Sequence, residues 1–112
     1  MDAIPREIRF YETAAGRVPC RDWLDAVEVR NRKLHGILVN RIDRVQEGNF
    51  GDCDPVGEGI SELRIDVGPG YRIYFGEDGD LVVLLLGDIK GTKKHQAKNI
   101  KQSKLFWRDY NA

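Results

Sequence analysis

The sequence is poor in cysteine and has no long apolar run. Cys20 and Cys53 are the two cysteines, and they do not stand in a C-x-x-C spacing. We therefore expect two reduced thiols rather than a disulfide or a zinc site. The longest apolar run, Leu81–Leu86, has the length of a strand and is too short to cross a bilayer. These shortages argue against a disulfide-stabilised scaffold and against a membrane-spanning protein.

The sequence also lacks the marks of a targeting segment and of a metal site. Residues 1–6 have no apolar core of a secretion signal, so we expect a cytoplasmic protein that does not engage a membrane. Asp52, Cys53, Asp54 and Glu58 have the composition of metal ligands, but their spacing fits no zinc or calcium pattern. We find no internal repeat and no low-complexity tract. No metal and no cofactor is predicted.

The composition is that of an ordinary globular domain. With 112 residues, 41% hydrophobic and 32% charged, the chain can form one core but not two. We predict a single domain over residues 1–112.

The formal net charge of zero conceals a strong asymmetry. Residues 1–89 hold 11 Lys and Arg against 17 Asp and Glu, whereas residues 90–112 hold 7 against 1. Segregated positive charge indicates a site for a polyanion or an acidic partner. An exposed helix with a lysine-rich solvent face explains the same pattern without any partner. The sequence alone leaves both interpretations open.

Hydrophobic periodicity and turn residues divide the chain into strands and helices. Pro19 suits the first turn of a helix, Gly48 suits a helix end, and Thr92 is a candidate N-cap. The predicted elements are a strand at Ile8–Tyr11, helices from Pro19 and at Val29–Glu47, a loop at Asn49–Gly59, a hairpin at Ile60–Phe75, an interior strand at Leu81–Leu86 and a helix at Thr92–Asp109. The second helix should pack through Leu34, Ile37, Leu38, Ile42 and Val45.

The predicted hairpin places two arginines on one face of a sheet. Its two alternating runs flank Gly68-Pro69-Gly70, and strand side chains alternate between faces. A three-residue connection would pair Val67 with Tyr71, Ile65 with Ile73 and Leu63 with Phe75, so that these apolar side chains share one face. On the polar face, Arg64 would lie opposite Tyr74, and Asp66 opposite Arg72. Such a face suits the binding of a phosphate.

The order of elements predicts an α+β domain. A strand, two helices, a three-strand meander and a C-terminal helix should form a small, mostly antiparallel sheet with the helices on one face. The other face should be partly open, and function is expected there.

Several short motifs along the chain resemble those of the RelE/ParE superfamily of bacterial toxins. The resemblance is strongest to its HigB-like "addiction module killer" branch, and it covers nearly the whole chain. The motifs are Val18-Pro19, Trp23-Leu24, Gly48–Asp52, Pro55–Gly57, Glu62-Leu63-Arg64, Gly70–Ile73 with Phe75, and Gly87-Asp88-x-Lys90. The resemblance implies a RelE-like fold.

The same resemblance implies the toxin of a type II toxin-antitoxin pair. Its partners would be a cognate antitoxin, a small helix-turn-helix protein, together with mRNA and the ribosome. The implied activity is that of an mRNA interferase, a metal-independent endoribonuclease that cleaves mRNA during translation. In that reaction the ribose 2′-hydroxyl attacks the neighbouring phosphate, so the enzyme supplies positioning, charge and proton transfer.

The resemblance also assigns roles to individual residues. Arg72 falls where ribonucleases of the family contact the scissile phosphate, and Arg64 lies where a basic residue assists. His95 falls near a position of proton transfer. Lys90, Lys93 and Lys94 would add positive charge around the RNA, and Tyr74 would stack on a base.

Each of these residues also has a purely structural interpretation. The two arginines could pair with Glu62 and Asp66 across strands, Tyr74 could shield the sheet, and His95 could be solvated at the start of a helix. Two functional alternatives stay open beside the nuclease. One is a ParE-like inhibitor of DNA gyrase without nuclease activity, and the other is an attenuated toxin that mainly binds its antitoxin.

Overall fold

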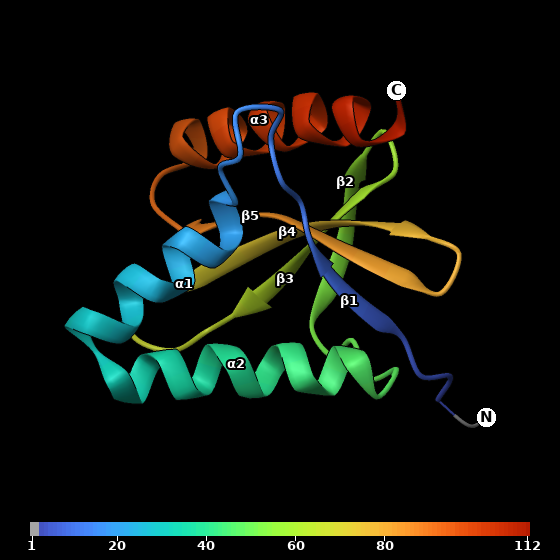
Figure 1. Cartoon of the computed structure of the whole chain (residues 1–112). Coiled ribbons are helices and arrows are strands. Elements are labelled where there is room, and N and C mark those ends of the chain that lie inside the picture. Colours follow the sequence, from blue (N-terminus) through green and yellow to red (C-terminus); the bar gives the residue numbers. More distant parts are fainter. Residues whose placement is uncertain (1–2) are drawn as a thin grey trace.

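Five strands form one mixed sheet with helices on both of its faces (Figure 1). The structure, a computed structural model, describes residues 3–112. The strands follow the order β1-β5-β4-β3-β2, with β1 parallel to β5 and all other neighbours antiparallel. The elements are β1 (Glu7–Phe10), α1 (Pro19–Arg30), α2 (Arg32–Gln46), β2 (Cys53–Gly57), β3 (Ile60–Ile65), β4 (Tyr71–Asp78), β5 (Leu81–Ile89) and α3 (Lys93–Asn111). The predicted α+β class is confirmed.

A single residue separates the first two helices. Asn31 has an extended backbone (φ −155°, ψ 88°), and its side chain accepts a hydrogen bond from the Leu34 amide at 3.1 Å. Asn31 therefore ends α1 and caps the N-terminus of α2. The predicted start of the second helix at Val29 is wrong, because Val29 and Arg30 still belong to α1.

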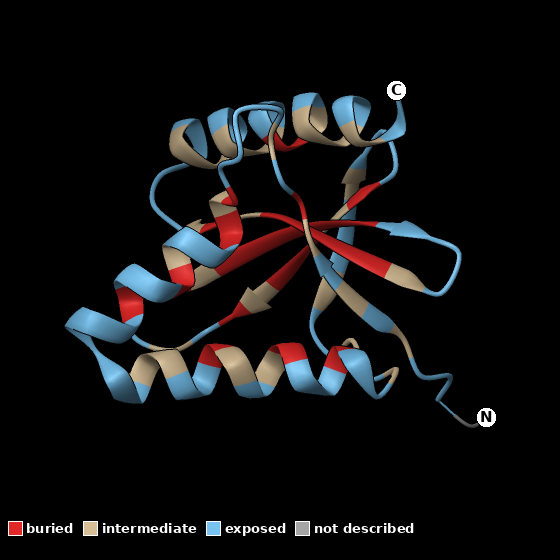
Figure 2. Ribbon diagram, viewed as in Figure 1, coloured by how far each residue is buried: buried red, intermediate tan, exposed pale blue. Residues whose placement is uncertain are grey.

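The helices α1 and α2 cover one face of the sheet and form the larger core. In Figure 2 their buried residues face the buried centre of the sheet. This core contains Cys20, Leu24, Val27, Leu38, Ile42 and Val45 from the helices and Leu63, Ile73, Phe75 and Leu84 from the strands. The predicted apolar stripe of α2 is confirmed except at Ile37, which is 36% exposed.

The helix α3 covers the opposite face, so the prediction that the helices share one face is wrong (Figure 1). The strands also carry apolar residues on the face that α3 covers, and these residues need a covering element. Ile60, Tyr74, Val83 and Leu85 are fully buried there. Ile100, Phe106, Trp107 and Tyr110 of α3 pack against them. The predicted interior strand is confirmed, since Val82, Val83, Leu84 and Leu85 are all buried.

The hairpin is paired two residues away from the predicted register. The observed Cα partners are Ile65 with Tyr71, Arg64 with Arg72 and Leu63 with Ile73. The connection is therefore five residues long, not three. A shift by two leaves each side chain on its predicted face, so the apolar and polar faces are as expected. What changes is that the two arginines become direct neighbours across the strands.

The predicted loop at 49–59 contains an edge strand, β2. Cys53 is the Cα partner of Leu63, and Pro55 that of Ser61. Proline is tolerated here because an edge strand needs hydrogen bonds on one side only. The Arg41 side chain of α2 donates to the carbonyl oxygens of Phe50 (2.9 Å), Asp52 (2.7 Å) and Arg64 (2.6 Å). This bridge fixes the segment before β2 against α2.

Further predictions concern thiols, metals and membranes. Cys20 and Cys53 are free, and burial raises the pKa of the Cys20 thiol to about 12. Within residues 3–112, no three His, Cys, Asp or Glu side chains group in a way that would hold a metal ion. No helix of the described chain is long and apolar enough to span a membrane.

Candidate functional site

Four residues from three elements lie together at one end of the sheet. Arg72 at the start of β4 is the Cα partner of Asp88 near the end of β5. His95, in the first turns of α3, places Nε2 2.8 Å from Oδ2 of Asp88. Asn99, one turn later, donates to the same oxygen at 2.9 Å. We call Arg72, Asp88, His95 and Asn99 the polar cluster.

The imidazole of His95 is held in a defined orientation. Thr92 caps α3 by accepting a hydrogen bond from the His95 amide at 3.1 Å, which confirms the predicted N-cap. Gly91 has φ +64°, and a Cβ atom there would lie 2.6 Å from the ring of His95. The ring thus packs against the Gly91 backbone. Because a carboxylate only accepts, Nε2 carries the proton of the bond to Asp88 and Nδ1 is the nitrogen left for proton transfer. The side chain is 38% exposed.

Arg72 lies on the expected face but is covered, contrary to the expectation of an open surface. The residue is 5% exposed. Its Nη1 donates to the carbonyl oxygen of Tyr71 at 2.9 Å and lies 3.5 Å from Oδ1 of Asp66. Its Nε is buried and has no hydrogen-bond partner among residues 3–112. The helix α3 packs on this face of the sheet, so the predicted open surface is wrong.

Tyr74, two residues further along β4, is also buried with an unused donor. Its hydroxyl makes no hydrogen bond within the described chain. Burial, and after it the carboxylate of Glu62, raise the pKa of Tyr74 to about 12. Buried donors without partners are uncommon in native proteins. Arg72 and Tyr74 therefore keep hydrogen-bonding capacity beside the polar cluster, but Tyr74 is not an exposed stacking platform.

Arg64 is occupied by carboxylates. Its guanidinium contacts Asp54, Asp52 (3.0 Å) and Glu62 (3.2 Å). These bonds, with that to Asp54 first, raise the pKa of Arg64 above its ordinary value. Although Arg64 is the cross-strand neighbour of Arg72, its side chain is turned toward β2. This geometry matches the structural interpretation of Arg64 rather than a phosphate-binding one.

Positive charge is concentrated beside the polar cluster. Lys90, Lys93 and Lys94 are exposed between β5 and the first turn of α3, and Lys98 and Lys101 continue this surface. A hollow of about 570 Å³ is lined by Lys94, His95, Lys98 and Lys101, among others. In the part of the chain that the structure describes, none of these five lysines forms an ion pair. We call them the lysine surface.

The other end of α3 is neutralised. Glu58 contacts Lys104 at 3.2 Å and Arg108 at 2.8 Å. These contacts lower the pKa of Glu58, with the bond to Arg108 as the larger cause. Within the described residues, the lysines of α3 that have no ion pair thus lie in the half that carries His95.

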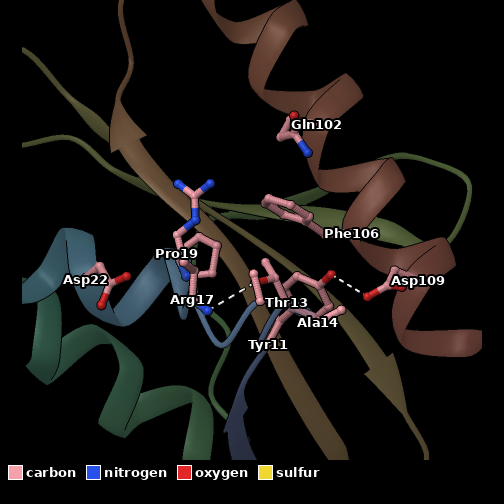
Figure 3. A pocket seen from close by; sticks show the side chains of 10 residues that line it. Tyr11, Thr13, Ala14, Arg17, Pro19, Asp22, Gln102, Phe106 and Asp109 are labelled. Carbon is pink, nitrogen blue, oxygen red and sulfur yellow. Dashed lines mark hydrogen bonds between the residues drawn. The ribbon is translucent and has the colours of Figure 1, made fainter.

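A larger cleft lies away from the polar cluster, between the β1–α1 connection and the C-terminal half of α3 (Figure 3). Its volume is about 670 Å³. The Tyr11 hydroxyl donates to Oδ2 of Asp109 at 2.6 Å at its base, and the side chain of Arg17 extends between α1 and α3. Burial, and then this bond, raise the pKa of Tyr11 to about 12. None of the predicted site residues lines this cleft.

The structure therefore keeps part of the predicted site together. Asp88 is the backbone partner of Arg72 and contacts His95 with its side chain, and Lys90, Lys93 and Lys94 lie on the neighbouring surface. Asp88 and Asn99 were not predicted as site residues. Asp88 stands in the motif Gly87-Asp88-x-Lys90, but no sequence signal showed that its carboxylate would meet a histidine seven residues later.

Comparison with known proteins relates the chain to another protein by sequence. No protein-family model matches the chain. An uncharacterized protein of Haemophilus influenzae is 48% identical over 85 residues, which are 75% of this chain and 81% of that protein. Identity at this level over most of both chains shows common descent. The chain thus belongs to the same protein family as this uncharacterized Haemophilus influenzae protein.

Proposed function

We propose that the protein is the toxin of a type II toxin-antitoxin pair, of the RelE/ParE superfamily and its HigB-like branch. In this proposal it is a metal-independent endoribonuclease that cleaves mRNA on the translating ribosome in the cytoplasm, and a small helix-turn-helix antitoxin holds it inactive. The observation that carries the proposal is the meeting of Arg72, Asp88 and His95 beside the lysine surface. The α+β fold, with its helical hairpin and C-terminal helix, is compatible with a RelE-like fold.

The polar cluster offers the groups that RNA cleavage by the 2′-hydroxyl requires. The 2′-hydroxyl loses its proton to water as its oxygen bonds to phosphorus, and the bond from phosphorus to the 5′-oxygen breaks, so that the 5′-oxygen needs a proton. His95 in its doubly protonated form, with Nε2–H bonded to Asp88, would give the 5′-oxygen the proton on Nδ1. The Arg72 Nε donor would stabilise charge on the phosphoryl oxygens. The lysine surface would attract and position the RNA backbone.

Access to Arg72 requires a local opening. Its side chain is 6% exposed, so a phosphate reaches it only if side chains of the first turns of α3 or of the 66–70 connection move aside. Binding energy from the lysine surface would be available for that movement. His95 needs no such opening, because its ring is already accessible.

The experiment is to add purified protein to a translating extract and to map message cleavage by primer extension. The wild type should cut, and Arg72→Ala and His95→Ala should each abolish the cut. Arg21→Ala, which removes an exposed arginine of α1 outside the polar cluster, is the matched control. Normal cleavage by both site variants would refute the site, and absence of cleavage by the wild type would refute the nuclease.

One observation favours a ParE-like gyrase inhibitor or an attenuated toxin over the nuclease. Arg72 is covered and Arg64 is paired with carboxylates, so neither guanidinium is free on an open surface. Gyrase-dependent DNA breaks without RNA cleavage would select a ParE-like inhibitor. Expression without growth arrest, together with tight binding of the antitoxin, would select the attenuated toxin.

A further inference from the structure

A groove follows the corner between α1 and α2 and reaches the end of the sheet. A cleft of about 510 Å³ is bounded by Trp23, Arg30, Asn31 and Leu34 on the helices and by Tyr71 and Ile89 on the strands, among others. A second hollow of about 300 Å³ shares Asn31, Leu34 and Tyr71 and extends to Lys33 and Pro69. The two hollows are therefore adjacent, and together we call them the corner groove. Asp88 of the polar cluster also borders it.

The floor of the corner groove is aromatic. Trp23 lies against the backbone of β5, where a Cβ atom at Gly87 would be 2.2 Å from its ring. The ring centroids of Trp23 and Tyr71 are 6.5 Å apart, at an interplanar angle of 45°. Both residues are only partly buried, although they border the larger core. Part of each is thus accessible in the groove, which suits the binding of a flat apolar ring.

The rim of the corner groove is cationic. Arg30 borders the larger hollow and Lys33 the smaller one, and both are exposed. Neither of them forms an ion pair within residues 3–112. The one carboxylate that borders the cleft, Asp88, accepts hydrogen bonds from the Ile89 amide and Asn99 and contacts His95. A cationic rim over an aromatic floor is the combination that binds single-stranded nucleic acids.

We propose that the corner groove binds single-stranded RNA, with a base stacked on Trp23 and Tyr71 and the backbone near Arg30 and Lys33. This inference rests on the proposed function, since it assigns the groove to the nucleotides next to the scissile phosphate. Tyr71 and Arg72 are consecutive on β4, so their side chains lie on opposite faces of the sheet. Asp88 borders the groove and contacts His95, so the two sites adjoin at this end of the sheet. A strand that passes over the end would place a base in the groove and a neighbouring phosphate at the polar cluster. The groove is then a determinant of sequence preference.

The two tryptophans allow a direct test. Trp107→Phe leaves Trp23 as the one tryptophan of the chain. This variant is titrated with a single-stranded oligonucleotide that carries 2′-O-methyl groups, which cannot be cleaved by 2′-hydroxyl attack. Stacking of a base on Trp23 should give saturable quenching of its fluorescence. Tyr71→Leu in the same background should weaken binding roughly 5- to 100-fold, the range found when one base–aromatic stack is removed.

Two exposed arginines of α1 allow a matched comparison that does not disturb the core. Arg30→Gln should weaken oligonucleotide binding and lower its dependence on salt, whereas Arg21→Gln, the same change on the same helix outside the groove, should change neither. Equal affinities for these two variants would overturn the inference. So would Trp23 fluorescence that does not respond, or that responds equally to a duplex of the same length, because a paired base cannot stack on the ring.

These outcomes separate the groove from the nuclease. Message cleavage without any response of Trp23 leaves the proposed function intact and overturns the groove. A saturable response of Trp23 without message cleavage supports the groove as an RNA site and refutes the nuclease.

Discussion

At the scale of single residues, Asp88 is the one on which the polar cluster depends. Its carboxylate contacts His95 and accepts from Asn99, and its Cα partner is Arg72. If His95 transfers a proton, Asp88 decides which nitrogen of the ring is available.

Asp88→Asn should therefore slow message cleavage by roughly 100-fold while the fold is retained, because an amide can stabilise the wrong histidine tautomer. Cleavage rates should be measured across pH 5 to 9, since a lost orienting carboxylate changes the pH profile and a packing defect lowers the rate evenly. Asp80→Asn, in the exposed turn before β5, is the control. An unchanged rate and profile in Asp88→Asn would exclude this role.

Much of the polar cluster could not be predicted from sequence, and the reasons are local. Arg72 and His95 were found by resemblance, but the coverage of Arg72 depends on where α3 docks. The neutralisation of Arg64 depends on β2, which brings Asp52 and Asp54 beside it. The contact of Asp88 with His95 depends on the turn at Gly91. Each is a property of packing between elements that no short motif encodes.

At the scale of elements, α3 is held on the sheet by an aromatic ring against a glycine. A Cβ atom at Gly76 of β4 would lie 2.6 Å from the Trp107 ring, so the ring occupies the space of the missing side chain. Trp107 also stacks on Tyr110, with ring centroids 5.2 Å apart. This contact sets how closely α3 approaches β4.

Gly76→Ala should destabilise the protein by about 1–3 kcal/mol, the usual cost of overpacking, because Trp107 must shift. Gly36→Ala is the opposite case, since Gly36 lies within α2 and a Cβ atom there meets nothing within 4 Å. That change should stabilise by roughly 0.5–1 kcal/mol through helix propensity. Denaturant unfolding of both variants measures the two effects, and equal shifts would contradict the assigned packing.

The elements themselves were largely predictable. Pro19, Gly48 and Thr92 marked helix ends correctly, because caps and turns are short-range. The edge strand β2 was missed because Pro55 and Gly57 usually interrupt regular structure, whereas an edge strand tolerates both residues. The side on which α3 packs was missed because the apolar stripe of a helix, here Ile100, Phe106 and Trp107, does not reveal which face of the sheet it covers.

At the scale of the whole molecule, ionisation of buried tyrosines should limit stability in alkali. The pKa values of Tyr11 and Tyr74 are raised to about 12 in the folded protein, from 10.0 for the free side chain. Folding then favours the protonated phenols, so this stabilisation is complete below pH 10 and is lost as pH rises from 10 to 12. Unfolding midpoints measured from pH 8 to 12 should fall over that range. The unfolding midpoint of the Tyr11→Phe variant should fall less steeply with pH. A midpoint of the wild type that does not change with pH would contradict the raised pKa values.

The unequal charge of the two parts of the chain should govern its affinity for RNA. Each lysine of the lysine surface that neutralises a phosphate contributes about 0.7 to the slope of log K against log salt concentration. Lys94→Gln combined with Lys98→Gln should therefore lower this slope by about 1.4. Lys104→Gln combined with Arg108→Gln should lower the slope less, because both side chains are ion-paired with Glu58. Equal slopes for the two double variants would show that RNA does not use this half of α3.

The joint at Asn31 has a consequence for selectivity. Because Asn31 alone separates α1 from α2, the connection leaves little freedom for the angle between the two helices to change. The corner groove beside this connection therefore has a fixed width and cannot adapt to the size of a bound base. Purines and pyrimidines differ in size, so the backbone geometry at Asn31 would by itself favour one of the two classes of base.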